Sequence, residues 1–433
     1  MRKNKVDVIS LGCSKNLVDS EHLIRQFQAN GYTVEHNPHR VNGEIVVVNT
    51  CGFIQDAQEE SINMILELGK AKKEGKIKKL FVMGCLAERF LAQLTKELPE
   101  VDKFYGKFNW TEMLADLGKS YKSELASERY ITTPKHYAYL KISEGCNRFC
   151  AFCAIPIITG RHKSVPMDAL LDEVRHLVKN GVKEFNVIAQ DLSSYGLDLY
   201  DKMMLPELID KMAMIDGVEW IRLHYAYPTQ FPYEILPVMA KHDNVCKYLD
   251  IALQHSSDKV LSNMQRHITR QQTVDLIKRI RKEVPGIHLR TTLMVGFPGE
   301  GEKEFDDLVS FVKEMRFERM GAFAYSEEEG TFAAKHYDDD ISEEVKTDRL
   351  DEIMNLQEEI SQEIQSEKVG KVLKVIIDSK DEVYYTGRTE WDSPEVDPEV
   401  LIPVNSCKLE IGNFYKIEIT DATPFELIGK LAE

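Results

Sequence analysis

The sequence of 433 residues has no run of about 18 uncharged apolar residues, so it lacks the pattern of a membrane-spanning helix. Its first residues lead straight into an apolar segment at 6–11, without the stretch of about 7–15 apolar residues that a secretion signal requires. With 43% hydrophobic and 29% charged residues, the composition is that of ordinary globular domains. We therefore expect a cytoplasmic protein with no membrane partner and, from its length, about two to four domains.

Positive charge is scarce, because 55 lysines and arginines stand against 71 acidic residues and give a formal net charge of −16. Non-specific binding to nucleic acid depends on basic contacts with phosphates, so direct nucleic-acid binding is disfavoured. An acidic surface suits a basic partner instead. The alternative, that the acidity only improves solubility, stays open at this point.

Phosphate-binding loops are also missing, since Gly296, Gly299 and Gly301 match neither the Walker nor the dinucleotide fingerprint. The chemistry of the chain lies instead in its eight cysteines. Disulfides are disfavoured in the cytoplasm, where clustered cysteines more often bind metal or carry out redox reactions. They are Cys13, Cys51, Cys85, Cys146, Cys150, Cys153, Cys246 and Cys407.

The first 130 residues repeat one pattern three times: an apolar strand, a turn that contains a cysteine next to a glycine, and a helix. The turns carry Cys13, Cys51 and Cys85. This pattern predicts a parallel sheet, in which ligands gather beyond the carboxyl ends of the strands. Three separate turns can therefore direct three thiolates to one point. Three buried core thiols remain the alternative.

The rest of the chain predicts two further domains. Strands and helices alternate from residue 137 to about 340, but five or six units are too few for a complete barrel, so a partial (open) βα barrel is expected. A helix is expected at 342–365. The tail has short strands that predict a small antiparallel barrel, possibly OB-like, with 8 basic and 14 acidic residues. The predicted fold class is α/β, with domains at 1–130, 131–365 and 366–433.

The most specific pattern in the chain is Cys146-x3-Cys150-x2-Cys153. Thiolates are soft ligands that select iron–sulfur clusters or zinc. A closed zinc site needs four protein ligands, and the nearest candidates for a fourth are His136 and His162. Three cysteines on a 4Fe–4S cluster leave one iron open for a substrate or cofactor. A zinc loop completed by a distant residue is the alternative.

This loop resembles that of the radical S-adenosylmethionine (SAM) superfamily, C-x3-C-x2-C with an aromatic residue before the last cysteine, here Phe152. The resemblance implies that the open iron binds the amino and carboxylate groups of SAM. One-electron transfer then cleaves SAM to a 5′-deoxyadenosyl radical. Phe152 and Gln190, the latter just beyond a predicted strand at 184–188, are the expected cofactor contacts. For Gln190 the alternative, a structural role in the loop that starts the next helix, stays open. No residue is assigned an acid–base catalytic role.

The whole chain resembles the methylthiotransferases, which combine a cysteine-bearing N-terminal domain, a radical domain and a C-terminal TRAM barrel. The segments 11–21, 49–54 and 84–86 are similar to the RimO-type branch, whereas the Gln-Met-Asn that usually follows the first cysteine in the MiaB-type branch is absent. The resemblance implies a second 4Fe–4S cluster on Cys13, Cys51 and Cys85. It also implies two SAM molecules, one supplying the methyl group and one the radical.

The RimO-type resemblance further implies the reaction partner: the β-carbon of one aspartate in small-subunit ribosomal protein number twelve receives a methylthio group. Ribosomal proteins are generally basic, which agrees with the acidic chain. A reductant such as flavodoxin or ferredoxin is expected, and the protein is expected to be a monomer. Two alternatives are kept: the same chemistry on a tRNA adenosine (MiaB-type), and a non-catalytic iron–sulfur or zinc scaffold.

Other residues carry weaker predictions. Arg290 is expected to pair with a carboxylate, either of a ligand or in a structural ion pair. His224 and His255 lie near predicted strand ends and are more often structural than functional. Cys246 and Cys407 fit no pattern and are expected to be packing residues.

Overall fold

The computed structural model describes residues 2–432, and its N-terminal part is built on five parallel strands in the order β2-β1-β3-β4-β5. Val46, Val47 and Val48 in the middle strand are fully buried, as expected where helices cover both faces of a parallel sheet. The strands are β1 (Arg2–Ser10), β2 (Thr33–His36), β3 (Gly43–Thr50), β4 (Lys79–Gly84) and β5 (Lys103–Phe104). The helices are α1 (Ser14–Ala29), α2 (Gln55–Lys73), α3 (Cys85–Glu97) and α4 (Trp110–Asp116), followed by the 3-10 turn η1 (Ser123–Leu125).

The three predicted strand–turn–helix units are present as β1-α1, β3-α2 and β4-α3. The edge strands β2 and β5 were not predicted, because they have four and two residues and lack a buried apolar run. One face of the sheet packs against α1 and α4 through Leu23, Phe27 and Met113. The other packs against α2 and α3 through residues such as Ile65 and Leu94.

Six parallel strands form the central sheet, in the order β13-β12-β11-β10-β9-β6. Within residues 2–432 the sheet does not close, so the predicted partial barrel is confirmed. Its strands are β6 (Tyr137–Lys141), β9 (Glu184–Ile188), β10 (Trp220–Ala226), β11 (Val245–Ile251), β12 (His288–Val295) and β13 (Arg319–Ala324). Its larger helices are α6 (Met167–Lys179), α8 (Leu205–Ala213), α9 (Ile235–Lys241), α11 (Arg270–Glu283) and α12 (Glu302–Met315).

Shorter elements complete this part at the loops that follow the strands. A small hairpin pairs β7 with β8, and the loop between them holds the cysteine motif. The elements are β7 (Ser143–Glu144), α5 (Ile155–Thr159), β8 (Lys163–Ser164), η2 (Leu192–Ser194), α7 (Leu197–Tyr200), α10 (Asp258–Asn263) and α13 (Phe332–His336).

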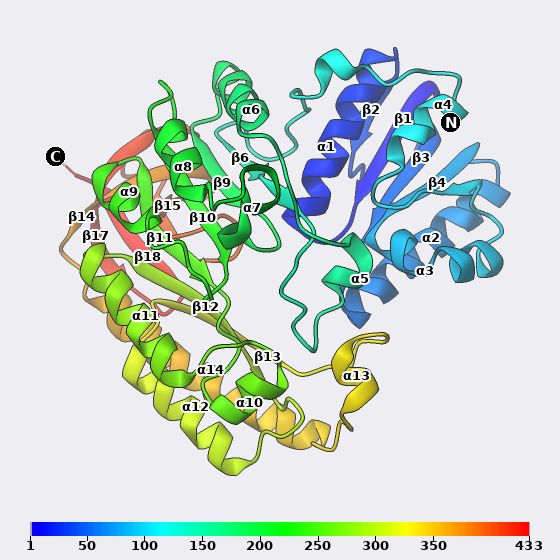
Figure 1. Ribbon diagram of the computed structural model, residues 1–433. Helices are drawn as coiled ribbons and strands as arrows, with labels where there is room; N and C mark the ends of the chain where they lie inside the picture. The colour runs from blue at the N-terminus through cyan, green and yellow to red at the C-terminus, as the bar shows by residue number, and fades with distance from the viewer. Residues whose placement is uncertain (1, 433) are drawn as a thin grey trace.

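Alternate residues of the central strands face opposite sides of the sheet. Phe185, Ile221 and Leu249 belong to the core that packs against the outer helices. Glu184 and Arg222 point to the other, inner side, where the two remaining parts of the chain lie. In Figure 1 the N-terminal part (blue) lies to the right of the central strands (green), and the C-terminal barrel (red) lies to their left.

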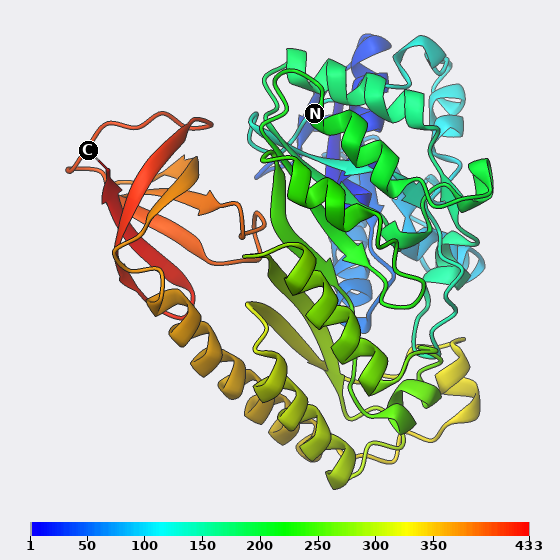
Figure 2. The same cartoon turned by 60° about the vertical axis from the view of Figure 1, so that its left-hand side comes forward.

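Helix α14 (Glu343–Ser366) connects the central sheet to the barrel, and the Ser342 side chain caps its first turn by accepting from the Val345 amide. In Figure 2 the barrel lies at one end of the molecule and α14 runs away from it along the central part. The barrel strands are β14 (Val372–Lys380), β15 (Tyr384–Thr389), β16 (Glu399–Pro403), β17 (Phe414–Ala422) and β18 (Glu426–Leu431).

The barrel closes in the order β14-β15-β16-β18-β17, and four of its pairs are antiparallel, as predicted. The fifth pair, β16 with β18, is parallel. A closed ring of five strands cannot alternate in direction all the way round, so one parallel pair is unavoidable. The sequence prediction did not include β18.

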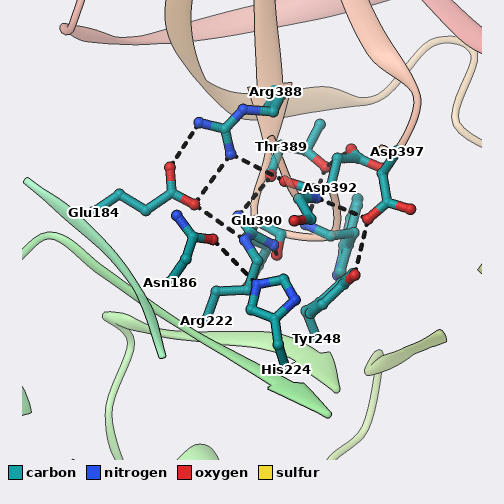
Figure 3. Close-up of polar contacts among 12 residues, drawn as sticks. Glu184, Asn186, Arg222, His224, Tyr248, Arg388, Thr389, Glu390, Asp392 and Asp397 are labelled. Atoms are coloured by element: carbon teal, nitrogen blue, oxygen red, sulfur yellow. Dashed lines mark hydrogen bonds and ion pairs between the residues drawn. The ribbon is translucent and has the colours of Figure 1, made fainter. Parts of the chain in front are cut away.

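The barrel docks on the inner face of the central sheet through buried charges (Figure 3). The Arg388 guanidinium contacts the Glu184 carboxylate at 2.7 Å, and both side chains are almost fully buried. Arg222 donates to the backbone oxygen of Glu390 at 2.6 Å. Tyr248 donates to Asp397 at 2.9 Å. Buried pairs of this kind fix an orientation, since removal of one partner leaves an uncompensated charge.

None of the helices within residues 2–432 is both long and apolar enough to cross a bilayer.

Candidate active site

Three cysteines meet at the carboxyl edge of the N-terminal sheet. Cys13 precedes α1 after β1, Cys51 follows β3, and Cys85 begins α3 directly after β4. These strands are neighbours in the sheet, so their ends lie side by side. The arrangement expected from the repeated pattern is therefore present.

Two glycines allow the cysteine-bearing turns to approach one another. A Cβ at Gly12 would lie 2.9 Å from Cys51 Sγ, and the residue has a positive φ of 87°. A Cβ at Gly84, with φ of 99°, would lie 2.6 Å from the Thr50 backbone oxygen. Side chains at both positions would be strained and would push the turns apart.

The second triad lies in the loop between β7 and α5. Cys146 is buried, whereas Cys150 and Cys153 are half-buried. Backbone and side-chain donors already point at two of the sulfurs: the Arg148 amide lies 3.4 Å from Cys146 Sγ, and Arg266 Nη1 lies 3.2 Å from Cys150 Sγ. Such donors stabilise a thiolate.

All six cysteines line a single cavity of about 370 Å³ between the N-terminal and central parts. The N-terminal turns form one wall. The other wall is formed by the loop with Cys146, Cys150 and Cys153, called here the radical-type loop, and by the carboxyl ends of β9, β10 and β11. Most of the lining is apolar, with side chains such as Phe53, Phe152 and Ile155. Two independent sulfur triads therefore share one partly open cavity.

Within residues 2–432, no three histidine, cysteine or acidic side chains are close enough to hold a single metal ion. A closed zinc site needs sulfurs within about 4 Å of each other, since each lies about 2.3 Å from the metal. The candidate fourth ligands are engaged elsewhere: His136 contacts Asp378 at 2.7 Å, and His162 contacts Ser164 at 3.1 Å. Each triad thus offers three soft thiol donors, and the two candidate fourth ligands are held by other partners.

Burial governs the protonation of the thiols. It raises the pKa of Cys85 to about 12, and nearby Cys13 and Cys51 add to the increase while Lys107 opposes it. It also raises the pKa of Cys146 to about 12. A coordinating thiol is deprotonated outright, so metal binding would reverse this tendency. These cysteines suit ligation and not free thiolate chemistry.

A buried charge network connects the two walls beside the cavity. Lys107 contacts Asp19 at 3.0 Å and Glu144 at 3.4 Å, and Lys141 contacts Glu144 at 2.9 Å as well as Asp19. Burial alone would raise the pKa of Asp19, but the two lysines outweigh it and lower the pKa to about 2. Since Asp19 lies on α1 and Lys141 on β6, the network ties the N-terminal part to the central part.

The predicted cofactor contacts both line the cavity. Phe152 packs edge-to-face on Phe297 with ring centroids 6.3 Å apart. Gln190 follows β9 and donates its side-chain amide to Glu144, while its buried Oε1 has no hydrogen-bond partner among the described residues. That unused acceptor is available to a bound molecule.

The residues with weaker predictions make structural contacts. Arg290 forms an ion pair with Asp397 of the barrel. His255 contacts Glu300 at 3.0 Å, and both side chains are fully buried. His224 contacts Asn186 at 3.2 Å. Cys246 packs among Trp220, Tyr248 and Ile376, and Cys407 packs against the barrel core, so both are the packing residues that were expected.

Several residues that line the cavity were not predicted from the sequence. Arg266 stacks on the Tyr227 ring at 4.1 Å and approaches Cys150, but it lies in no recognisable motif. Gln254 and Tyr225 line the cavity with positive φ values of 72° and 64°. Unusual backbone of this kind cannot be read from residue type. Lys15 lies in the segment 11–21 that resembles the RimO-type branch, but the sequence pattern of that segment gives this lysine no role.

Three family models match the chain in succession. They are the Uncharacterized protein family UPF0004 over residues 5–106, the Radical SAM superfamily over residues 140–312 and the TRAM domain over residues 369–431. The fold and the site thus define a radical SAM enzyme with an additional cysteine-bearing domain and a C-terminal barrel. The radical SAM match supports a 4Fe–4S cluster and SAM as cofactors.

Similar proteins identify the family within this class. The chain is 65% identical over 431 residues to the ribosomal protein uS12 methylthiotransferase RimO of Parabacteroides distasonis, with 100% of both chains covered. It is 51% identical over 433 residues to the protein of the same name from Flavobacterium johnsoniae, covering 100% of this chain and 99% of that one. The chain therefore belongs to the RimO family of radical SAM methylthiotransferases.

Solved structures agree on the fold. The radical SAM methyltransferase TsrM from Kitasatospora setae superimposes with a TM-score of 0.54 over 75% of each chain, at 13% identity. The cobalamin-dependent SAM radical enzyme OxsB gives a TM-score of 0.52, with 82% of this chain and 56% of that one covered, at 12% identity. At these identities the likeness shows the fold alone.

Proposed function

We propose that the chain adds a methylthio group to the β-carbon of an aspartate in ribosomal protein uS12. The observation that carries the proposal is the single cavity lined by both cysteine triads. A methylthio transfer to carbon needs a radical source and a sulfur source at the same substrate atom. Full-length similarity to uS12 methylthiotransferases supports the choice of substrate.

Each triad is assigned one 4Fe–4S cluster: Cys146, Cys150 and Cys153 would hold the cluster that works with SAM, and Cys13, Cys51 and Cys85 the second. When bound, the first cluster and SAM supply a carbon-centred radical able to break an unactivated C–H bond, and the second handles the sulfur. The match to the N-terminal family model supports the second cluster. Three ligands per cluster leave one iron of each without a protein ligand.

The chain's own residues hold and shield these groups. Arg266 donates to Cys150 Sγ and stacks on Tyr227, which fixes both side chains beside the radical-type loop. Phe152 and Gln190 would contact SAM, with the free Gln190 Oε1 as a hydrogen-bond acceptor. The apolar lining excludes water, which protects a reactive radical from side reactions.

The proposed partners follow from this reaction. uS12 would be the protein substrate, and its expected basic character complements the net charge of −16. A small reductant such as flavodoxin or ferredoxin would deliver the electron. We propose a cytoplasmic monomer with the domain boundaries given above, and two SAM molecules per turnover.

The experiment is anaerobic incubation of the reconstituted chain with SAM, a strong reductant, sulfide and purified uS12, followed by mass spectrometry of uS12. The proposal expects the mass increment of one methylthio group on a single aspartate. Total tRNA serves as the competing substrate in a parallel reaction. Methylthiolated adenosine in place of modified uS12 would favour the tRNA reaction, and no 5′-deoxyadenosine at all would favour a scaffold.

A further inference from the structure

The cavity has an unusual charge for this acidic chain. Its lining includes four cationic side chains, Lys15, Lys107, Arg148 and Arg266, and among residues 2–432 no aspartate or glutamate lines it. A site of this kind favours an anionic group. Which of the four cations can bind such a group depends on the partners that each already has.

Three of the four are already engaged. Lys107 pairs with Asp19 and Glu144. Arg148 pairs with Asp191 at 2.7 Å.

The third, Arg266, donates to Cys150 Sγ and to the backbone oxygen of Ala252. These side chains are held by partners of opposite or complementary charge, so they are not available to a further anion without losing a contact.

Lys15 differs from them. Its ammonium lies 3.5 Å from the centroid of the Tyr225 ring. Among the described residues it forms no salt bridge within 4.0 Å, although its charge acts on Asp250 and His224. A cation held only by an aromatic face keeps its hydrogen-bond donors for another partner.

The position of Lys15 places it between the two triads. It lies in the first turn of α1, two residues after Cys13, and reaches across to Tyr225 near the end of β10. Tyr225 has a φ of 64°, a conformation that is unusual for a bulky side chain and is typical of functional sites. The pair therefore spans the gap between the N-terminal wall and the central wall of the cavity.

A buried side-chain donor without a partner in the described part of the chain lies on β9, outside the cavity lining. Asn186 is fully buried, and its side-chain nitrogen has no hydrogen-bond partner among the described residues. Its oxygen contacts His224, the residue before Tyr225. The nearby Asp250 forms no salt bridge with Lys15 within 4.0 Å. Burial raises the pKa of Asp250 to about 6, and the charges of Arg290 and Lys15 oppose this increase.

We propose that Lys15 binds the side-chain carboxylate of the acceptor aspartate, an inference that rests on the proposed function and adds a residue that determines specificity. The β-carbon of aspartate is bonded directly to its carboxyl carbon. An ammonium that holds a carboxylate oxygen therefore fixes the reacting carbon two bonds from the contacted atom. The position between the triads then presents that carbon to both.

The test compares binding of uS12 with binding of uS12 whose modified aspartate has been replaced by asparagine. Affinities are measured anaerobically by fluorescence anisotropy with the reconstituted full-length chain, without reductant, so that no turnover is needed. The wild-type chain should bind the aspartate form about ten-fold more tightly, the usual contribution of one charged hydrogen bond. Lys15→Met should bind both forms equally, and Lys15→Arg should keep most of the preference.

Lys119→Met is the matched control, because Lys119 also lies over a tyrosine ring, Tyr32 at 5.4 Å, but is exposed and outside the cavity. It should retain the full preference. Equal binding of both uS12 forms by the wild type would overturn the inference whatever the variants do, and so would an unchanged preference in Lys15→Met. If the wild type neither binds nor modifies uS12, the proposed function itself fails.

Discussion

The two cysteine triads are assembled by the chain in different ways. Cys146, Cys150 and Cys153 lie within eight residues of one loop. Cys13, Cys51 and Cys85 are spread over 73 residues and meet only because β1, β3 and β4 are neighbours in a parallel sheet. The first triad depends on local loop conformation and the second on the fold of a whole domain. The difference predicts distinct responses to mutation.

The largest expected effect comes from breaking the loop triad. Cys146→Ala should abolish formation of 5′-deoxyadenosine, because a cluster with two protein ligands does not hold SAM productively. The variant should keep about half of the iron of the wild type, since the other triad is intact. Iron analysis and chromatography of the SAM cleavage products measure both.

Cys407→Ala is the control for the loss of a thiol elsewhere, and it should keep all of the iron and the full activity. A Cys146→Ala protein that bound no iron at all would contradict the model of two independent clusters.

Breaking the other triad should separate the two chemical steps. Cys51→Ala should still form 5′-deoxyadenosine at a rate within a few-fold of wild type, but it should transfer no methylthio group to uS12. The reason is that the radical-forming loop is unaffected, whereas the sulfur-handling cluster is lost. Mass spectrometry of uS12 together with SAM cleavage measures the split, and equal loss of both reactions would count against the assignment.

The same contrast explains what could be predicted from the sequence. The loop triad is identified by spacing alone. The N-terminal triad followed from a repeated strand, turn and helix, because parallel strands align their carboxyl ends. The fold class and the partial barrel also followed from this alternation. Bounds such as Glu184–Ile188 for β9 agree with the expected strand.

Other features depend on contacts that no local pattern contains. The edge strands β2 and β5 are too short to show periodicity, and the parallel β16–β18 pair follows from ring closure. Arg266 reaches Cys150 across 116 positions of sequence. The sequence also does not show that Lys15 differs from the other cations of the cavity, because their partners are brought to them only by the fold.

A smaller effect is expected where the N-terminal turns approach each other. Gly12→Ala would place a Cβ 2.9 Å from Cys51 Sγ in addition to the strain of a positive φ. We expect a loss of stability of about 1–2 kcal/mol from the backbone and a several-fold loss of iron from the N-terminal site. Thermal unfolding and iron content of the purified protein measure the two effects.

Gly31→Ala separates the two contributions, because Gly31 has nearly the same φ, 85°, but nothing within 4 Å of an added Cβ. It should lose similar stability and keep all of its iron. Iron loss in both variants alike would show that the close approach at Gly12 has no part in the site.

The smallest expected effect concerns the charge network that holds the two walls together. The pKa of Asp19 is lowered to about 2 by Lys107 and Lys141, so its carboxylate stabilises the folded chain above about pH 4, and this contribution is lost as the pH falls toward 2. Asp19→Asn should therefore reduce stability by about 1–2 kcal/mol at pH 6. The difference from wild type should shrink as the pH is lowered to 3. Urea midpoints measured over this range check the trend, and a difference independent of pH would rule out the carboxylate charge as the cause.

The central claim is that both triads hold clusters that face one shared cavity. Electron paramagnetic resonance of the fully reduced protein tests it most directly, because two paramagnetic clusters on either side of a cavity of about 370 Å³ interact magnetically. The account predicts a wild-type spectrum that is broadened or split relative to the sum of the Cys146→Ala and Cys51→Ala spectra. A wild-type spectrum equal to that sum would place the clusters far apart and contradict the shared site.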